Sequence, residues 1–158
     1  MLEHVLKFLI PSEIRVFPKL TKSRDPYYFY RWDQDSDTGS AVLRYWFWSR
    51  DRSRKNRKRV FVSEAERLLE NTLDAGEMTR GDFKQYCPKT NRDGGCGFAV
   101  IVGVFESLGI VCHTEQRGVY AIVDREMARL MLGDWKTEGM QEESTFSSDE
   151  RPGKDVGT

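Results

Sequence analysis

Cysteine and histidine, from which disulfide frameworks and many catalytic or metal sites are built, are scarce in this sequence. The 158 residues contain three cysteines and two histidines. An odd number of cysteines disfavours a disulfide-stapled secreted fold. No cysteines are spaced C-x-x-C, and Cys112 and His113 would point to opposite sides of a strand, so we expect no zinc site. Asp33, Asp35 and Asp37 lack the glycine and glutamate that a calcium loop needs at its sixth and twelfth positions. We therefore predict buried thiols, no metal, no cofactor and a cytoplasmic location.

Long apolar runs are also absent. The longest, Phe98 to Phe105, has eight residues, far fewer than the roughly 20 that a membrane-spanning helix needs. At the amino terminus, Glu3 precedes the lone Lys7 and no small-residue cleavage site follows. A secretory signal is therefore not expected, and neither is a membrane partner.

Net charge is absent as well, because 25 basic residues balance 25 acidic ones, but the two signs are unevenly placed. Between Arg50 and Arg59 the chain reads RDRSRKNRKR, where seven basic residues oppose Asp51 and give a local charge of +6. From Asp134 to the end, seven acidic residues oppose three basic ones and give −4. A local basic field attracts phosphate whatever the overall isoelectric point. Residues 133–158 are predicted to be a disordered acidic tail.

The first part of the chain, residues 1–62, is predicted to combine a short helix with an aromatic-rich antiparallel β-hairpin. Apolar residues recur at helical spacing before Pro11. Two runs of strand-forming residues, Tyr27 to Trp32 and Ala41 to Trp48, flank the polar turn DQDSDTGS. The basic segment follows as a loop, and a third short strand is expected over Val60 to Val62.

Two capping boxes predict helices in the second part of the chain. Ser63 followed by Glu66 is expected to begin a helix of about three turns that ends at a glycine. Thr79 followed by Asp82 is expected to begin a shorter helix, which Pro88 closes.

After the turn KTNRDGG, an apolar helix, two short strands around EQRG and a last helix begun by Asp124 are predicted. This order of helix, short helix, turn, longer helix and two-stranded wing, from Ser63 to Met131, resembles a winged helix-turn-helix module. The resemblance includes a leucine–glycine helix end, an aliphatic strand and a glycine turn before an aromatic strand, formed by Leu108, Gly109, Ile110, Val111, Gly118 and Tyr120. It implies an α+β fold with a winged-helix module over residues 63–132. Members of this superfamily bind DNA, act as protein–protein adapters or form structural parts of enzymes.

The third helix of this module departs from a DNA-reading winged helix, which exposes several polar side chains to the major groove. Phe98 to Phe105 contains no polar side chain. Only Lys89, Thr90, Asn91 and Arg92, at the leading edge of the helix, could reach a base. We expect the helix to be buried against the amino-terminal sheet or a second subunit.

The basic segment is the strongest functional feature. A cluster of one sign neutralises several phosphates and gives salt-sensitive, sequence-tolerant binding. We predict a non-enzymatic nucleic-acid-binding protein, with double-stranded DNA as the expected partner and a role in transcription regulation or as an accessory factor of a mobile element or phage. The hairpin aromatics could stack bases, although cross-strand packing explains them equally well. The predicted contact residues are Arg50, Arg52, Arg54, Lys55, Arg57, Lys58, Arg59, Lys89, Asn91, Arg92, Gln116 and Arg117.

Two other functions stay open at this stage. In the first, the protein is an adapter whose apolar helix and aromatic sheet form a homodimer or partner interface. In the second, GGCGFAVIVGVFESLGI resembles the catalytic-cysteine helix of cell-wall cysteine peptidases, which implies a hydrolase that uses Cys96 with His113 or His4. Because the chain has so few histidines, this is the weaker alternative.

Overall fold

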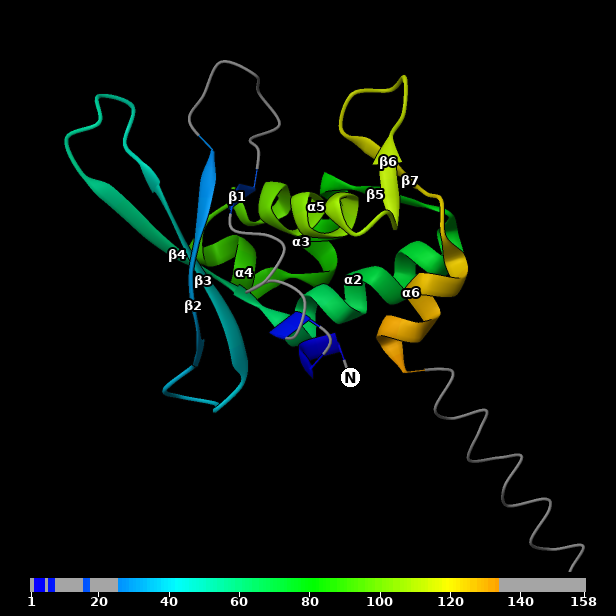
Figure 1. Cartoon of the computed structure of the whole chain (residues 1–158), viewed down its shortest axis with the longest axis horizontal. Coiled ribbons are helices and arrows are strands. Elements are labelled where there is room, and N and C mark those ends of the chain that lie inside the picture. The colour runs from blue at the N-terminus through cyan, green and yellow to red at the C-terminus, as the bar shows by residue number, and fades with distance from the viewer. Residues whose placement is uncertain (1, 5, 8–15, 18–25, 134–158) are drawn as a thin grey trace, which may run out of the picture.

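Two antiparallel sheets and a set of short helices build a mixed α+β fold (Figure 1). The computed structural model describes residues 2–4, 6–7, 16–17 and 26–133. The first two of these ranges, residues 2–4 and 6–7, are helical, as the amino-terminal spacing predicts. The predicted acidic tail lies outside the described residues, apart from Gly133.

The amino-terminal sheet has four strands in the order β1–β2–β3–β4. The predicted hairpin is confirmed as β2 and β3, which pair antiparallel with a bulge between Phe29 and Arg31. The strand bounds are Val16–Phe17 for β1, Tyr27–Gln34 for β2, Ala41–Trp48 for β3 and Lys55–Phe61 for β4.

The second half of the basic segment is strand, so the prediction of the whole segment as a loop is wrong. β4 begins at Lys55 and pairs with β3 along its full length, from Lys55 opposite Trp48 to Phe61 opposite Val42. The predicted short strand at 60–62 is only the end of β4, since Val62 already begins the next helix. Lysine and arginine have weak strand preference, but their stems can lie along apolar rings while their charged ends stay in water.

The second part of the chain carries the remaining elements, with a second sheet in the order β5–β7–β6. The predicted apolar helix, wing strands and last helix are confirmed, as is the capping box between Thr79 and Asp82. The bounds are Val62–Ala75 for α2, Glu77–Thr79 for β5, Arg80–Tyr86 for α3, Pro88–Asp93 for α4, Gly97–Ser107 for α5, Val111–His113 for β6, Val119–Ile122 for β7 and Arg125–Leu132 for α6.

Two predicted helix boundaries are wrong. The cap residue of α2 is Phe61, without a side-chain cap, and Glu66 instead accepts a hydrogen bond from the amide of Leu2 at 3.1 Å. Pro88 does not close α3, which ends at Tyr86, but opens α4, where the predicted turn was placed. Proline suits the first helical position because its fixed φ is helical and its missing N–H has no partner there.

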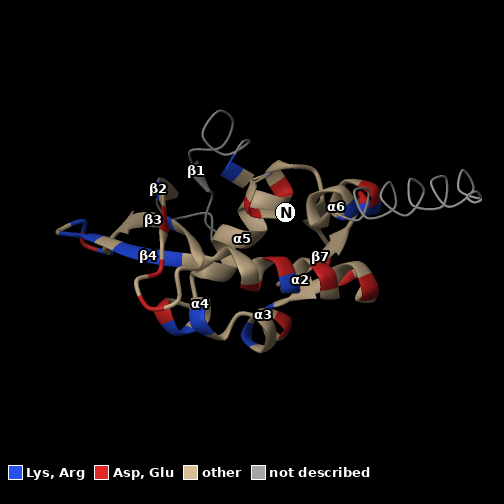
Figure 2. Ribbon diagram, turned by 90° about the horizontal axis from the view of Figure 1, so that it is seen from below, with Lys and Arg blue, Asp and Glu red and all other residues tan. Residues whose placement is uncertain are grey.

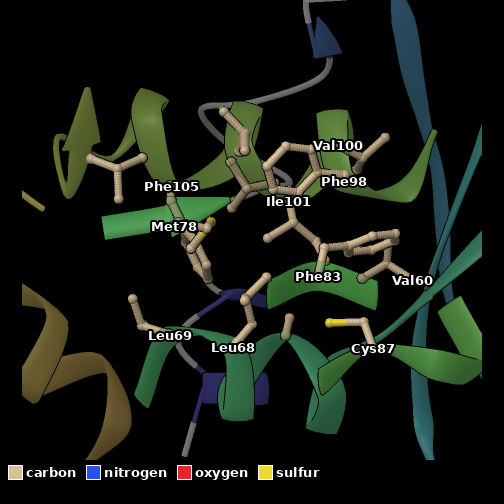
Figure 3. Close-up of a cluster of buried hydrophobic side chains, with 14 of the residues drawn as sticks. Val60, Leu68, Leu69, Met78, Phe83, Cys87, Phe98, Val100, Ile101 and Phe105 are labelled. Carbon is tan, nitrogen blue, oxygen red and sulfur yellow. The ribbon is translucent and has the colours of Figure 1, made fainter. Parts of the chain in front are cut away.

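Helix α5 lies at the centre of the hydrophobic core (Figure 3). Every residue from Gly97 to Phe105 is buried, and the helix contacts β1, β4, α4 and β6. Figure 3 shows Phe98, Ile101 and Phe105 of this helix facing side chains of α2 and α3. The expectation that the helix is buried against the amino-terminal sheet is confirmed. No helix among the described residues is long and apolar enough to cross a membrane.

Candidate nucleic-acid interface

The β3–β4 ladder sorts the basic segment onto two faces of the sheet, because side chains alternate along a strand. On the outer face, Trp46 lies opposite Arg57 and Trp48 opposite Lys55. On the inner face, Tyr45 lies opposite Lys58 and is buried in the core. Figure 2 shows the lysines and arginines following β4 into the turn at the tip of the hairpin.

Aromatic and cationic side chains interleave on the outer face. We call this set the cationic–aromatic face, which consists of Tyr28, Tyr30, Trp46, Trp48, Arg52, Lys55 and Arg57. The Lys55 ammonium lies 4.6 Å from the Trp46 ring centroid and 5.7 Å from that of Trp48. Arg52 lies 5.2 Å from the Trp48 ring, and Arg57 lies 5.5 Å from the Tyr30 ring. These cation–π contacts hold the charges over the sheet.

The rings of this face also pack on one another. Tyr28 stacks on Trp46 with centroids 4.4 Å apart and planes 18° apart. Trp46 meets Trp48 edge to face at 5.5 Å. Such pairs stabilise a hairpin beyond the area they bury. The cations therefore rest on a fixed aromatic base.

Carboxylates neutralise the arginines at the other end of the hairpin. Asp33 accepts from Arg44 at 2.7 Å and forms an ion pair with Arg31 at 3.2 Å. The hydrogen bond from Arg44 is the main cause of the lowered pKa of Asp33. Among the described residues, by contrast, neither Lys55 nor Arg57 forms an ion pair with a carboxylate.

Carboxylates also neutralise Arg59, which is one of the predicted contact residues. Its guanidinium lies 2.9 Å from Asp35 and 3.4 Å from Asp93. The hydroxyl of Thr38 donates to Asp35 and is the main cause of the lowered pKa of that carboxyl. Asp33 therefore interacts with arginines, and Asp35 interacts with Arg59 and with Thr38 in the turn. Lys55 and Arg57, which form no ion pair with a carboxylate among the described residues, lie nearer the hairpin tip.

The tip is a six-residue turn, Ser49 to Arg54, organised by Asp51. Its carboxylate accepts from the hydroxyl of Ser53 at 2.7 Å, the hydroxyl of Ser49 at 2.8 Å and the amide of Ser53 at 3.0 Å. These bonds lower the pKa of Asp51 to about 2, with the Ser53 hydroxyl as the largest cause. Arg52 takes the left-handed conformation, with φ of 60°. The single acidic residue of the basic segment therefore shapes the turn that exposes the arginines on either side of it.

Lys58 and the α4 residues lie apart from the cationic–aromatic face. Lys58 points to the inner side, where its aliphatic stem passes close to Gly94. Helix α4 runs beside the edge of β4, because Asp93 accepts from the amide of Arg59 at 2.6 Å and Thr90 accepts from that of Phe61 at 3.0 Å. The predicted contacts on α4 are Lys89 and Arg92, which are exposed, and Asn91, which is half-buried.

A hollow of about 360 Å³ lies between α4 and the base of the hairpin. Lys89, Arg92 and Arg59 line it together with Asp35, Asp37 and Asp93. Because acidic and basic groups alternate there, this hollow attracts a polyanion less than the hairpin tip does.

The buried carboxylate of Glu64 fixes α4, and sequence reasoning did not find it. Glu64 is 3% exposed and accepts from the amides of Lys89 at 2.9 Å and Thr90 at 2.8 Å, and from the Thr90 hydroxyl at 2.8 Å. It therefore caps the first turn of α4 from the start of α2. The only signal in the sequence is an acidic residue in the first turn of α2, which is common in helices whatever their contacts.

The wing residues form a third, separate cluster. Gln116 and Arg117 line a hollow of about 290 Å³ together with Arg80, His113 and Thr114. In Figure 1 the loop between β6 and β7 and the β3–β4 hairpin stand at opposite sides of the molecule. The predicted contact residues therefore do not form one continuous surface.

The structure does not bring Cys96 and His113 together. The Cys96 thiol lies 3.0 Å from the hydroxyl of the buried Tyr45 at the start of α5. His113 pairs with Glu106 at 2.5 Å, in the last turn of the same helix. Ten residues of helix separate Cys96 from Glu106, which is about 15 Å along the axis.

The other cysteines differ in exposure. Cys87 is buried, as predicted, and its burial raises the pKa of the thiol to about 12. Cys112 is exposed on β6, so the prediction that all three thiols are buried is wrong. No cluster of three or more metal-ligating side chains occurs within the described ranges.

Comparisons of this chain with protein-family models, with curated proteins and with solved structures find no match.

Proposed function

We propose that this protein binds nucleic acid without catalysing a reaction, and that it holds the phosphate backbone on the cationic–aromatic face. The observation that carries the proposal is that Lys55 and Arg57 lie over aromatic rings and form no ion pair with a carboxylate among the described residues, whereas aspartates neutralise Arg31, Arg44 and Arg59. Arg52 adds a third cation, over the ring of Trp48. Cations gathered on one face release counterions when they meet phosphates. A role in transcription regulation, or as an accessory factor of a mobile element, fits this sequence-tolerant mode of binding.

We also propose that the second part of the chain is a winged helix-turn-helix module. The succession α2, β5, α3, α5, β6 and β7, with β7 central in the small sheet, supports this assignment. α4 is an addition between α3 and α5. Since α5 is buried, it would not read a major groove. Base contacts on duplex DNA would fall to Lys89, Asn91 and Arg92 on α4 and to Arg117 in the wing.

Neutralising the hairpin cations tests the nucleic-acid proposal. In the variant Arg52→Gln, Lys55→Gln, Arg57→Gln, we expect weaker binding to a 16-nucleotide labelled probe, measured by fluorescence anisotropy across a salt series. The slope of log affinity against log salt should become shallower by up to about 2.7 for a duplex and about 2.1 for a single strand, because each lost phosphate contact contributes about 0.9 or 0.7.

The control for this variant makes the same change in charge elsewhere. Arg67→Gln, Lys84→Gln and Arg129→Gln are exposed substitutions on α2, α3 and α6. We expect this triple variant to keep the wild-type slope. Equal losses in the two variants would show that net charge, and not the hairpin, governs binding. Absence of binding by the wild type at low salt would refute the proposal.

The adapter alternative has one observation in its favour. Met127 and Leu130 on α6 and Val123, just before the helix, are 38%, 40% and 56% exposed. A second copy of the chain could pair through these residues, although three side chains supply only part of the roughly 800 Å² per partner of a stable interface. If so, light scattering should find a dimer in the wild type and a monomer in Leu130→Glu. A monomeric wild type at about 100 μM would exclude this interface.

A further inference from the structure

We infer that the cationic–aromatic face binds single-stranded nucleic acid, with unpaired bases stacking on its rings while its cations hold the phosphates. This inference rests on the proposed function and adds to it the class of nucleic acid. Four rings, those of Tyr28, Tyr30, Trp46 and Trp48, lie on the same side of the sheet as Arg52, Lys55 and Arg57.

The rings on this face are accessible. Tyr30 is 43% exposed, and Tyr28, Trp46 and Trp48 are half-buried. By contrast, the inner-face rings Tyr27 and Tyr45 are buried. Packing of the core therefore explains the inner aromatics but leaves the outer rings without a core to fill.

Flexible cationic side chains lie over the tryptophan rings. Lys55 contacts both Trp46 and Trp48, and Arg52 also contacts Trp48. A long cationic side chain can swing aside, so that a base takes its place on the ring while the charge moves to the neighbouring phosphate. The stacking of a base on an aromatic ring tolerates any sequence, because every base has a π-face.

The spacing along β3 suits a strand of nucleotides. Trp46 and Trp48 are two residues apart on one face, which places their Cα atoms about 7 Å apart along the strand, and their ring centroids lie 5.5 Å apart. Successive rings can therefore carry successive bases of an extended strand. A paired duplex keeps its bases stacked inside the helix, so these rings could reach only its backbone.

Burial of α5 strengthens the same inference. A winged helix that reads duplex DNA places its third helix in the major groove. Here that helix is covered by β1, β4 and α4 and exposes none of its residues from Gly97 to Phe105. The helix that usually reads base edges in a duplex is therefore not accessible here, whereas an exposed face of rings and cations can bind unpaired bases.

The test compares three labelled 16-mers on the full chain by fluorescence anisotropy: a pyrimidine-rich DNA single strand, the RNA of the same sequence, and the matching DNA duplex. We expect both single strands to bind more tightly than the duplex at 150 mM salt. A difference between the DNA and RNA strands would show whether the sugar is also recognised.

The variants separate rings from charges. Trp46→Leu with Trp48→Leu keeps both positions apolar and keeps every charge but removes both indole rings. It should weaken single-strand binding roughly a hundredfold, about tenfold per ring, and should weaken duplex binding much less, because a duplex contacts only the charges. Trp46→Phe with Trp48→Phe should restore most of the affinity. Quenching of tryptophan fluorescence by the single strand should be lost in both.

Circular dichroism checks that each variant is folded. If the double leucine variant does not fold, Tyr30→Leu replaces it, since that ring is the most exposed of the four, and a several-fold loss is expected. The inference is overturned if ring variants bind single strands like the wild type, or if the duplex binds more tightly. If the charge variant weakens binding while ring variants do not, only the stacking fails. If no probe binds, the proposed function fails too.

Discussion

Replacing Glu64 with alanine is expected to lower the free energy of unfolding by about 3–4 kcal/mol. The substitution removes a carboxylate that is 3% exposed and that accepts three hydrogen bonds, two from the first turn of α4 and one from the Thr90 hydroxyl. Each hydrogen bond to a charged group contributes about 1.5–3 kcal/mol, and buried donors left without an acceptor add to the cost. The three effects are not additive because the groups share one site.

Denaturant unfolding measures this change, with a constant m-value as the sign that the midpoint shift reflects stability. Glu64→Gln keeps one oxygen for Thr90 but turns an N–H₂ group toward the amide of Lys89, so about half the loss is expected. Glu70→Ala, an exposed position on the same helix, should change stability by less than about 0.5 kcal/mol. A loss below about 1 kcal/mol in Glu64→Ala would mean that water replaces the carboxylate at the start of α4.

Loss of the Glu64 carboxylate should also affect binding, because α4 carries several of the predicted contact residues. Lys89 and Arg92 project from a six-residue helix that is too short to be stable alone. Its position depends on Glu64 at one end and on the Asp93 and Thr90 bonds to β4 along its side. The cationic–aromatic face does not depend on α4, so destabilising this helix should affect single-strand binding less than it affects duplex binding.

Local signals made much of the fold predictable. The hairpin of β2 and β3 follows from two alternating aromatic runs around a polar turn, and α3 follows from the capping box of Thr79 and Asp82. Both are encoded within a few neighbouring residues. The burial of α5 was equally predictable, because a helix with no polar side chain from Phe98 to Phe105 must be covered on all sides over that stretch.

Boundaries set by distant contacts were not predictable. Lys55 to Arg59 has the composition of a loop, yet it pairs with β3 because the aromatic rings opposite accept its cations. The sequence pattern predicted that Glu66 caps its own helix, but its carboxylate accepts from the amide of Leu2. Glu64, two residues earlier, caps α4. In each case the deciding partner lies far along the chain, so no local pattern records it.

In the candidate interface, too, local sequence predicts one part and distant contacts decide the other. The sequence located the positive charge but could not say which cations the fold would neutralise. Arg59 and Arg57 are two residues apart on one face, yet Arg59 is paired with Asp35 and Asp93 whereas Arg57 lies over Tyr30. Lys58, between them, points to the opposite face because of strand alternation. Charge counts alone therefore overestimate the number of side chains that can meet one nucleic-acid strand.

Gly97→Ala is expected to destabilise the protein by about 2–3 kcal/mol through overpacking. A Cβ atom at this position would lie 2.6 Å from Cγ2 of Thr90 and 3.4 Å from the ring of Phe83. Thr90 cannot rotate away freely, because its hydroxyl donates to Glu64 and accepts from the amide of Phe61. The glycine thus permits the close approach of α4 to the start of α5.

A double-mutant cycle tests this explanation. Thr90→Ser removes the clashing methyl group but keeps the hydroxyl and both of its hydrogen bonds, at a cost of about 1 kcal/mol for the lost burial. In that background Gly97→Ala should add little, which gives a coupling of about 2 kcal/mol between the two sites. Gly81→Ala is the control, since its Cβ would meet only Oγ1 of Thr79 at 3.6 Å, and alanine in a helix is favoured over glycine. Strictly additive losses at residues 90 and 97 would show that the clash is relieved elsewhere and that the contact between α4 and α5 does not require glycine.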